Sequence, residues 1–155
     1  LPAFEARLRV RERKHPKLYW VDPGLVRAIK KQFGPVSTEE RGPLLEGWVL
    51  SLLRAHGEEK RLFDDIFYWA PVQAKRVEVD FLLKRGREFL AIEVKSQKRF
   101  SNSLLPGLRA LEDLPKVARR VLVYGGTRKL RASNQIDVWT VEDLANALAD
   151  DTLWP

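Results

Sequence analysis

Residues 78–95 limit the possible folds of this chain more than any other segment. Two apolar stretches flank a short turn that contains Gly86, a pattern that predicts an antiparallel β-hairpin. The first stretch contains Asp80, and the second contains Glu93 and Lys95. Burying such charges costs free energy unless they meet one another or a metal ion. The hairpin therefore predicts a charged site at the edge of a packed sheet.

Strand geometry indicates which of these side chains can meet. Residues two apart share one face of a strand, so Glu93 and Lys95 project together while Ile92 and Val94 face the core. Asp80 can approach Glu93 across the hairpin, and two such carboxylates repel unless a cation joins them. Oxygen ligands favour Mg²⁺ or Mn²⁺ over Zn²⁺. A neighbouring lysine can orient or deprotonate a water and stabilise a developing charge. The alternative is that Glu93 and Lys95 form an ordinary exposed ion pair.

Composition narrows the function classes. A length of 155 residues predicts one domain, and 45% apolar with 32% charged residues is typical of a globular protein. The absence of cysteine excludes disulfides and thiolate metal sites and suits a cytoplasmic location. No apolar stretch approaches the roughly 20 residues of a membrane span, so no membrane partner is expected. The net charge of +7 favours a polyanionic partner, DNA first, although an ordinary basic protein is the alternative.

The N-terminal third mixes irregular and helical patterns. Residues 1–17, which include Lys17, are basic and irregular, which is typical of a nucleic-acid-contacting arm or of a linker. Residues 18–21 predict a short strand or buried segment. Asp22 followed by Pro23 then predicts a helix to about Gln32, because Pro suits the first helical position.

A longer helix is expected from Pro43 to about Ala55, with Gly57 just past its end. Glu46 lies just beyond the edge of its apolar stripe, from where its carboxylate can reach a neighbouring strand. The alternative is a solvated glutamate in the first helical turn, where it suits the helix dipole. The stripe follows the 3.6-residue period: Leu44, Leu45, Trp48, Val49, Leu52 and Leu53.

The remaining elements alternate between strand and helix. Apolar runs predict strands at 66–72, 78–84, 87–95, 121–124 and 136–140. Ser101 or Ser103 predicts the start of a helix to about Leu114, and Thr140 with Asp143 predicts a capped helix over 141–149. The order α-β-β-β-α-β indicates an α/β domain with a central mixed sheet flanked by helices.

Three motifs in this order resemble the PD-(D/E)XK nuclease superfamily: Gly42-x3-Glu46-x2-Val49, Glu78-Val79-Asp80-Phe81 and Ile92-Glu93-Val94-Lys95-Ser96. The chain more closely resembles the C-terminal domain of unknown function that follows an AAA-type ATPase module in many archaeal and bacterial proteins. Residues 17–25 are similar to the motif at which that domain begins. The resemblance covers about residues 15–140, and residues 1–14 resemble the connector from the ATPase.

The resemblance implies a restriction-endonuclease-like core and a role for each matching residue. Glu46 matches the helix carboxylate that supports the metal, Asp80 the primary metal ligand, Glu93 the second ligand and Lys95 the catalytic lysine. Val79 departs from the superfamily pattern, which has proline there.

These observations predict a Mg²⁺- or Mn²⁺-dependent DNA endonuclease-like domain at residues 17–155, with residues 1–16 as the connector from an upstream ATPase domain. Because the first residue is not methionine, we expect this chain to be a piece of a longer protein. Lys98 and Arg99 are expected to contact DNA, and homodimerisation is left open. The alternatives are a non-catalytic nucleic-acid- or protein-binding module that regulates the ATPase, and a toxin-like or defence effector arm.

Overall fold

The predicted hairpin forms the middle of the sheet. The computed structural model describes residues 1–4, 15–71, 77–111 and 116–155. Strand β2 (Val79–Arg85) pairs antiparallel with β3 (Glu88–Lys95), and Arg85 pairs with Glu88 across a two-residue turn. Gly86, the first turn residue, has a φ of 58°, as a type II′ turn requires.

A six-stranded mixed sheet extends to both sides of the hairpin, in the order β1-β2-β3-β4-β6-β5. The first three strands form an antiparallel meander, β3, β4 and β6 run parallel, and β5 is an antiparallel edge strand. This architecture confirms the predicted α/β class with a central mixed sheet. The remaining strands are β1 (Asp65–Trp69), β4 (Val117–Tyr124), β5 (Leu130–Arg131) and β6 (Ile136–Trp139).

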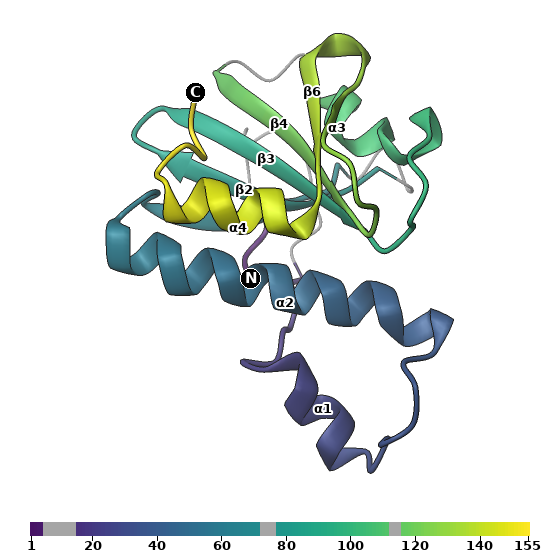
Figure 1. Ribbon diagram of the computed structural model, residues 1–155. Helices are drawn as coiled ribbons and strands as arrows, with labels where there is room; N and C mark the ends of the chain where they lie inside the picture. Colours follow the sequence, from purple (N-terminus) through teal and green to yellow (C-terminus); the bar gives the residue numbers. More distant parts are fainter. Residues whose placement is uncertain (5–14, 72–76, 112–115) are drawn as a thin grey trace.

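Helices cover both faces of the sheet (Figure 1). Helices α2 (Thr38–Lys60) and α4 (Val141–Ala149) pack on one face, over a core that includes Val49, Phe81 and Leu144. The short α3 (Pro106–Ala110) packs on the other face, over a second core that includes Leu82 and Leu108. Helix α1 (Pro23–Ile29) lies beyond α2, away from the sheet (Figure 1). Within the described ranges, no helix combines the length and the apolar character that a membrane crossing needs.

Helix α2 is longer at both ends than the sequence predicts. Ser37 and Glu40 form a capping box that starts the helix before Pro43, so the proline lies inside it. The capping box satisfies backbone donors at the N-terminus, which offsets the single hydrogen bond that proline removes. Gly57 lies within the helix rather than after it, and the helix ends where Arg61 adopts a left-handed conformation with a φ of 52°.

Other predicted elements are also corrected. Residues 18–21 form no strand, and Leu18 and Val21 are 88% and 86% exposed, because this segment leaves the sheet and passes α2 on its way to α1 (Figure 1). Trp48 is 47% exposed rather than part of the buried stripe. The helix predicted from Ser101 is instead a 3₁₀ turn, η1 (Asn102–Leu104), followed by α3. Pro106 cannot donate a backbone hydrogen bond, so it starts a new helix.

Further boundaries differ at the ends of elements, where hydrogen bonds fray. Helix α1 ends at Ile29 rather than Gln32, and β1 ends at Trp69. The helix over 141–149 forms with the predicted Thr140–Asp143 capping box. The predicted ends at Val72 and Leu114, and most of the basic N-terminal run, lie outside the described residues.

The first residues of the chain lie along β1. Phe4 N donates to the Tyr68 carbonyl at 2.8 Å, and Tyr68 N donates to the Pro2 carbonyl at 3.0 Å. Leu1 and Lys17 exchange backbone hydrogen bonds of 2.6 and 3.0 Å. These contacts anchor the start of the 15–22 segment beside the sheet. The domain boundary at residue 17 stays a prediction.

Gly107 of α3 lies against the start of the hairpin. A Cβ atom there would come well inside 3.0 Å of the Glu78 carbonyl oxygen. We expect Gly107→Ala to lower the free energy of unfolding by about 1–3 kcal/mol, because backbone cannot move aside easily. Gly42→Ala is the control: it meets open space in α2 and should stabilise by about 0.5–1 kcal/mol. Urea unfolding of both variants checks this, and an unchanged Gly107→Ala protein would contradict the packing.

Candidate functional site

The hairpin brings Asp80 and Glu93 together. Phe81 pairs with Ile92, so the next pair toward the start of β2 and the end of β3 is Asp80 with Glu93. They are 6% and 5% exposed and are the buried charged side chains of the described residues. Asp80 Oδ2 accepts a hydrogen bond of 2.8 Å from Val94 N, which fixes that carboxylate against β3.

Lys95 completes the strand part of the site. Its Nζ pairs with Glu93 Oε1, as expected for residues two apart on a strand. Glu93 Oε2 is buried and has no hydrogen-bond partner among the described residues. Glu93 and Lys95 line a hollow of about 320 Å³ together with Asp80, Glu78 and Gly107. The hollow gives the orphaned oxygen of Glu93 space for a ligand, water or ion.

Glu46 reaches this site from α2. Lys17 Nζ lies 3.2 Å from Glu46 Oε1 and 3.3 Å from Asp80 Oδ1, so one ammonium group connects the two carboxylates. Because α2 begins at Thr38, Glu46 lies in the third helical turn and not in the first. The alternative of a dipole-stabilised first-turn glutamate is therefore wrong, and the structure brings all four predicted site residues together.

Sequence reasoning assigned no site role to Lys17, Tyr19 or Glu78. Lys17 Nζ also forms an ion pair with Glu78, and the Tyr19 hydroxyl donates to Glu46 Oε1. The spacing of Lys17 and Tyr19 could have indicated a shared role, since residues two apart on an extended segment share one face. Below, the carboxylate cluster means Glu46, Glu78, Asp80 and Glu93.

Comparison with protein families identifies the family of this chain. A family model described as a domain of unknown function, DUF4143, matches residues 41–144. The chain belongs to the DUF4143 family. No curated protein and no solved structure matches it. The matched region of this DUF4143 domain contains Glu46, Asp80, Glu93 and Lys95, whereas Lys17 lies before it.

Burial dominates the electrostatics of the two acids in this DUF4143 domain. Burial, with the charge of Glu46, raises the pKa of Asp80 to about 6, although Lys17 opposes the shift. Burial, with the charge of Asp80, raises the pKa of Glu93 to about 8 despite the Lys95 ammonium. The protonation state of both carboxyls therefore changes close to neutral pH.

At Lys17 and Lys95, neighbouring carboxylates outweigh burial and raise the pKa. Burial alone would lower the pKa of Lys17, but the charges of Asp80 and Glu46 outweigh it and raise that pKa. Burial is likewise outweighed at Lys95, where Glu93 raises the pKa above its ordinary value. Both lysines are therefore cations at neutral pH, which favours charge stabilisation over proton abstraction as the role of Lys95.

The donor chemistry fits a hard divalent ion, but the side chains are arranged around lysine. Carboxylate oxygens are the ligands that Mg²⁺ and Mn²⁺ prefer, and Glu93 Oε2 is an orphaned acceptor. Within the described ranges, however, no group of three His, Cys, Asp or Glu side chains is arranged so that it could hold a metal ion. Glu46, Glu78 and Asp80 instead converge on Lys17. An ion can use these oxygens only if the lysine moves.

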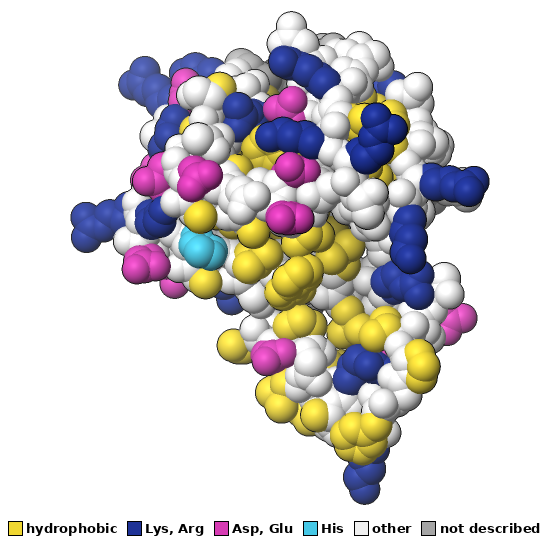
Figure 2. Space-filling view, in the orientation of Figure 1, with side chains coloured by type: hydrophobic (Ala, Val, Ile, Leu, Met, Phe, Trp, Pro, Cys, Tyr) yellow, Lys and Arg dark blue, Asp and Glu magenta, His cyan; other side chains and the backbone are white. Residues whose placement is uncertain are grey.

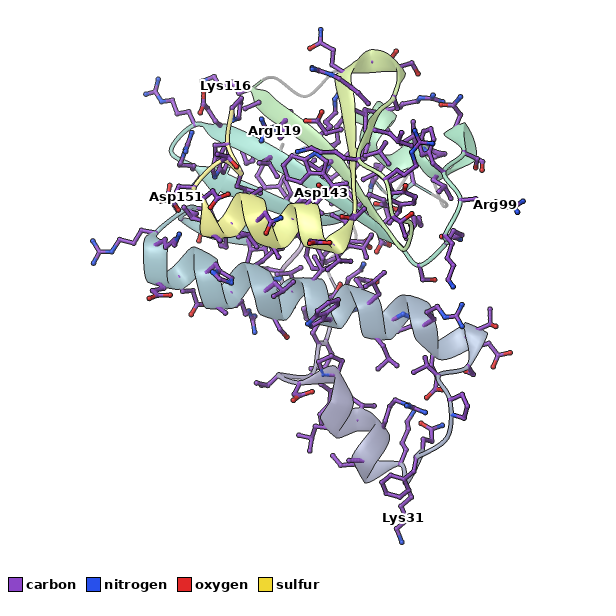
Figure 3. All side chains as sticks on the ribbon, in the orientation of Figure 1. Lys31, Arg99, Lys116, Arg119, Asp143 and Asp151 are labelled. Atoms are coloured by element: carbon purple, nitrogen blue, oxygen red, sulfur yellow. The ribbon has the colours of Figure 1, made fainter. Side chains whose placement is uncertain are left out.

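The predicted DNA-contacting residues lie just beyond the site. Lys98 and Arg99 are exposed in the loop after β3, and Arg99 projects away from the body of the domain (Figure 3). Figure 2 shows Lys and Arg side chains spread over the sheet domain, whereas apolar side chains gather around α1. Contact of Lys98 and Arg99 with DNA stays a prediction.

The pKa shifts predict how stability depends on pH. Because the folded protein holds protons on Asp80 and Glu93 more tightly than the unfolded chain, stability falls as pH rises from 3.8, the ordinary pKa of Asp80, to about 8, the raised pKa of Glu93. We expect Glu93→Gln to flatten this slope and, at pH 8, to add on the order of 2 kcal/mol to the free energy of unfolding. Urea unfolding at pH 5, 6.5 and 8 measures it. Glu88→Gln, an exposed change on the same strand, should keep the wild-type slope, and a Glu93→Gln slope like the wild type's would refute the shift.

Proposed function

We propose that this domain is a Mg²⁺-dependent nuclease that hydrolyses phosphodiester bonds in DNA. One observation carries the proposal: Asp80, Glu93 and Lys95 line one hollow at the end of the hairpin, and Lys17 joins Glu46 of α2 to Asp80. Buried acids with raised pKa values beside charged lysines are typical of catalytic sites. The resemblance to the PD-(D/E)XK superfamily agrees with this assignment, although fold alone does not establish activity.

Each residue has a role in this chemistry. Asp80, Glu93 and Glu46 would hold the ion, and Mg²⁺ when bound supplies positive charge to the phosphate and lowers the pKa of a water. In hydrolysis, a water oxygen bonds to phosphorus, the bond from phosphorus to the leaving sugar oxygen breaks, and one proton of the water ends on that sugar oxygen. Lys95, a cation, stabilises the charge that gathers on the phosphate oxygens. The position of Lys95 on β3, two residues after Glu93, keeps its ammonium beside the Glu93 carboxylate.

The expected partners follow from charge and from the family. DUF4143 domains are commonly found next to AAA-type ATPase domains, which supports an upstream ATPase as the partner of this domain in the same protein. The net charge of +7 supports DNA as substrate. A cytoplasmic location belongs to the same proposal, and homodimerisation stays open.

A second candidate is a non-catalytic module that binds protein and regulates the ATPase. The surface around α1 favours it, because Leu25, Ile29 and Phe33 are 49%, 59% and 82% exposed. Contiguous exposed apolar side chains mark interaction surfaces. In this case the carboxylate cluster and its lysines would serve stability alone.

Cleavage kinetics separate the two candidates. We expect Mg²⁺-dependent cleavage of DNA, tested on linear, branched and single-stranded substrates, and a loss of about 10²-fold or more in rate for Asp80→Asn and Lys95→Ala. DNA affinity should change little in Lys95→Ala, because the lysine acts on the transition state. Lys84→Ala removes a lysine on β2 outside the hollow and should retain full activity. If the wild type cleaves none of these substrates, the regulatory candidate stands.

DNA binding should depend steeply on salt, because Lys and Arg act by releasing counterions from phosphates. We expect the double variant Lys98→Ala/Arg99→Ala to bind more weakly and to reduce the slope of log affinity against log salt by up to about 2. The charge-matched control is Lys30→Ala/Lys31→Ala: Lys30 is the C-cap of α1, and Lys31 lies at the far tip of the molecule (Figure 3). Fluorescence anisotropy at several salt concentrations measures both, and an affinity independent of salt would point to a protein partner.

A further inference from the structure

We propose that Lys17 is the resident cation of the carboxylate cluster, and that a divalent ion binds Glu46 and Asp80 only when Lys17 withdraws. The 15–22 segment thus controls loading of the metal. This inference rests on the proposed function, because it assigns a control device to the same metal site.

The contacts of Lys17 carry the argument. Its single ammonium meets three carboxylates that come from three places: Glu46 on α2, Glu78 before β2 and Asp80 on β2. The distances to Glu46 Oε1 and Asp80 Oδ1 are 3.2 and 3.3 Å. A cation surrounded by oxygens from several elements is the arrangement that a metal ion would otherwise create.

The lysine and the ion cannot share these oxygens. Glu46 Oε1 and Asp80 Oδ1 are the atoms that face the ammonium, and a divalent ion on the same atoms would stand beside a like charge in a largely buried site. Like charges at such separations repel strongly where water is excluded. Metal binding therefore requires the ammonium to leave, and the cost of its departure subtracts from the affinity for the ion.

The segment that bears Lys17 is held by hydrogen bonds outside the strand pairing of the sheet. The hydrogen bonds that hold it include backbone pairing with Leu1, a 2.6 Å bond from the Tyr68 hydroxyl to the His15 carbonyl, and one of 3.1 Å from Ser51 Oγ to the Val21 carbonyl. The Tyr19 ring also packs against the core, with its centroid 6.0 Å from that of Phe81. None of these bonds belongs to the pairing of β1 to β6. Tyr19 holds Glu46 through its hydroxyl, so withdrawal of the segment also frees that carboxylate.

Metal titration of charge variants tests the inference directly. We expect Lys17→Gln, which keeps hydrogen-bond donors but removes the charge, to bind Mn²⁺ at least 10-fold more tightly than the wild type in calorimetric titration with MnCl₂. Lys17→Arg keeps the charge and should stay within about 3-fold of the wild type. Lys84→Gln removes a lysine of β2 that lies outside the cluster, so it controls for net charge and should leave the affinity unchanged.

Thermal unfolding adds a readout that needs no catalysis. In EDTA, Lys17→Gln should unfold at a lower temperature than the wild type, because three carboxylates lose their counter-ion. Mn²⁺ should raise its unfolding temperature more than it raises that of the wild type. Adding Asp80→Asn to Lys17→Gln should abolish the gain, since Asp80 holds the ion.

The outcomes are distinct. If the wild type and Lys17→Gln bind Mn²⁺ equally, Lys17 does not compete and this inference fails, while the proposed function stands. If neither binds Mn²⁺, both the metal site and this inference fail. A Lys17→Gln protein that is unfolded in EDTA but folds in Mn²⁺ supports the inference. One that stays unfolded in both overturns it, because the ion then cannot replace the ammonium.

Discussion

The neutralisation of two buried carboxylates is the constraint on which this structure depends. Asp80 and Glu93 lie side by side at the end of the central hairpin, almost fully removed from water. Burial of two neighbouring acids is costly unless cations meet them or protons neutralise them. Lys17 and Lys95 supply the cations, and the raised pKa values of both acids show that the compensation is partial. The two acids are therefore only partly neutralised, and negative charge remains that a ligand can bind.

The fold assembles this site from parts that are distant in the chain. The hairpin contributes two acids and one lysine, α2 contributes Glu46, and the segment before α1 contributes Lys17 and Tyr19. Helix α3 closes the other side, where Gly107 allows backbone to approach Glu78 closely. Such a site depends on the packing of α2 and α3 on opposite faces of one sheet (Figure 1). Changes in either core would therefore be felt in the arrangement of the carboxylates.

The nuclease and regulatory candidates differ in what the cluster does when Lys17 moves. In the nuclease candidate, the site binds an ion and a phosphate when Lys17 withdraws, so the 15–22 segment controls the enzyme. A cluster that merely loses stability is a structural element beside an apolar surface. Both follow from the same electrostatics, which is why metal affinity and cleavage have to be measured on the same variants.

The sequence by itself determined the local features. Alternation of apolar and charged residues over 78–95 was enough to predict the hairpin, its turn at Gly86 and the shared face of Glu93 and Lys95, because strand periodicity is a local property. The α/β class and the last capped helix followed in the same way. Element ends were less certain: the capping box at Ser37 and the exposed course of residues 18–21 depend on competition between local signals and packing.

Only the tertiary structure decided how the charges are paired. Spacing could place Asp80 opposite Glu93, but the meeting of Lys17 with Glu46, Glu78 and Asp80 joins residues up to 63 positions apart. No local pattern encodes such a contact, because it depends on where α2 and the N-terminal segment pack against the sheet. The burial that raises the pKa values of Asp80 and Glu93 likewise arises only when α3 and the strands exclude water from around them.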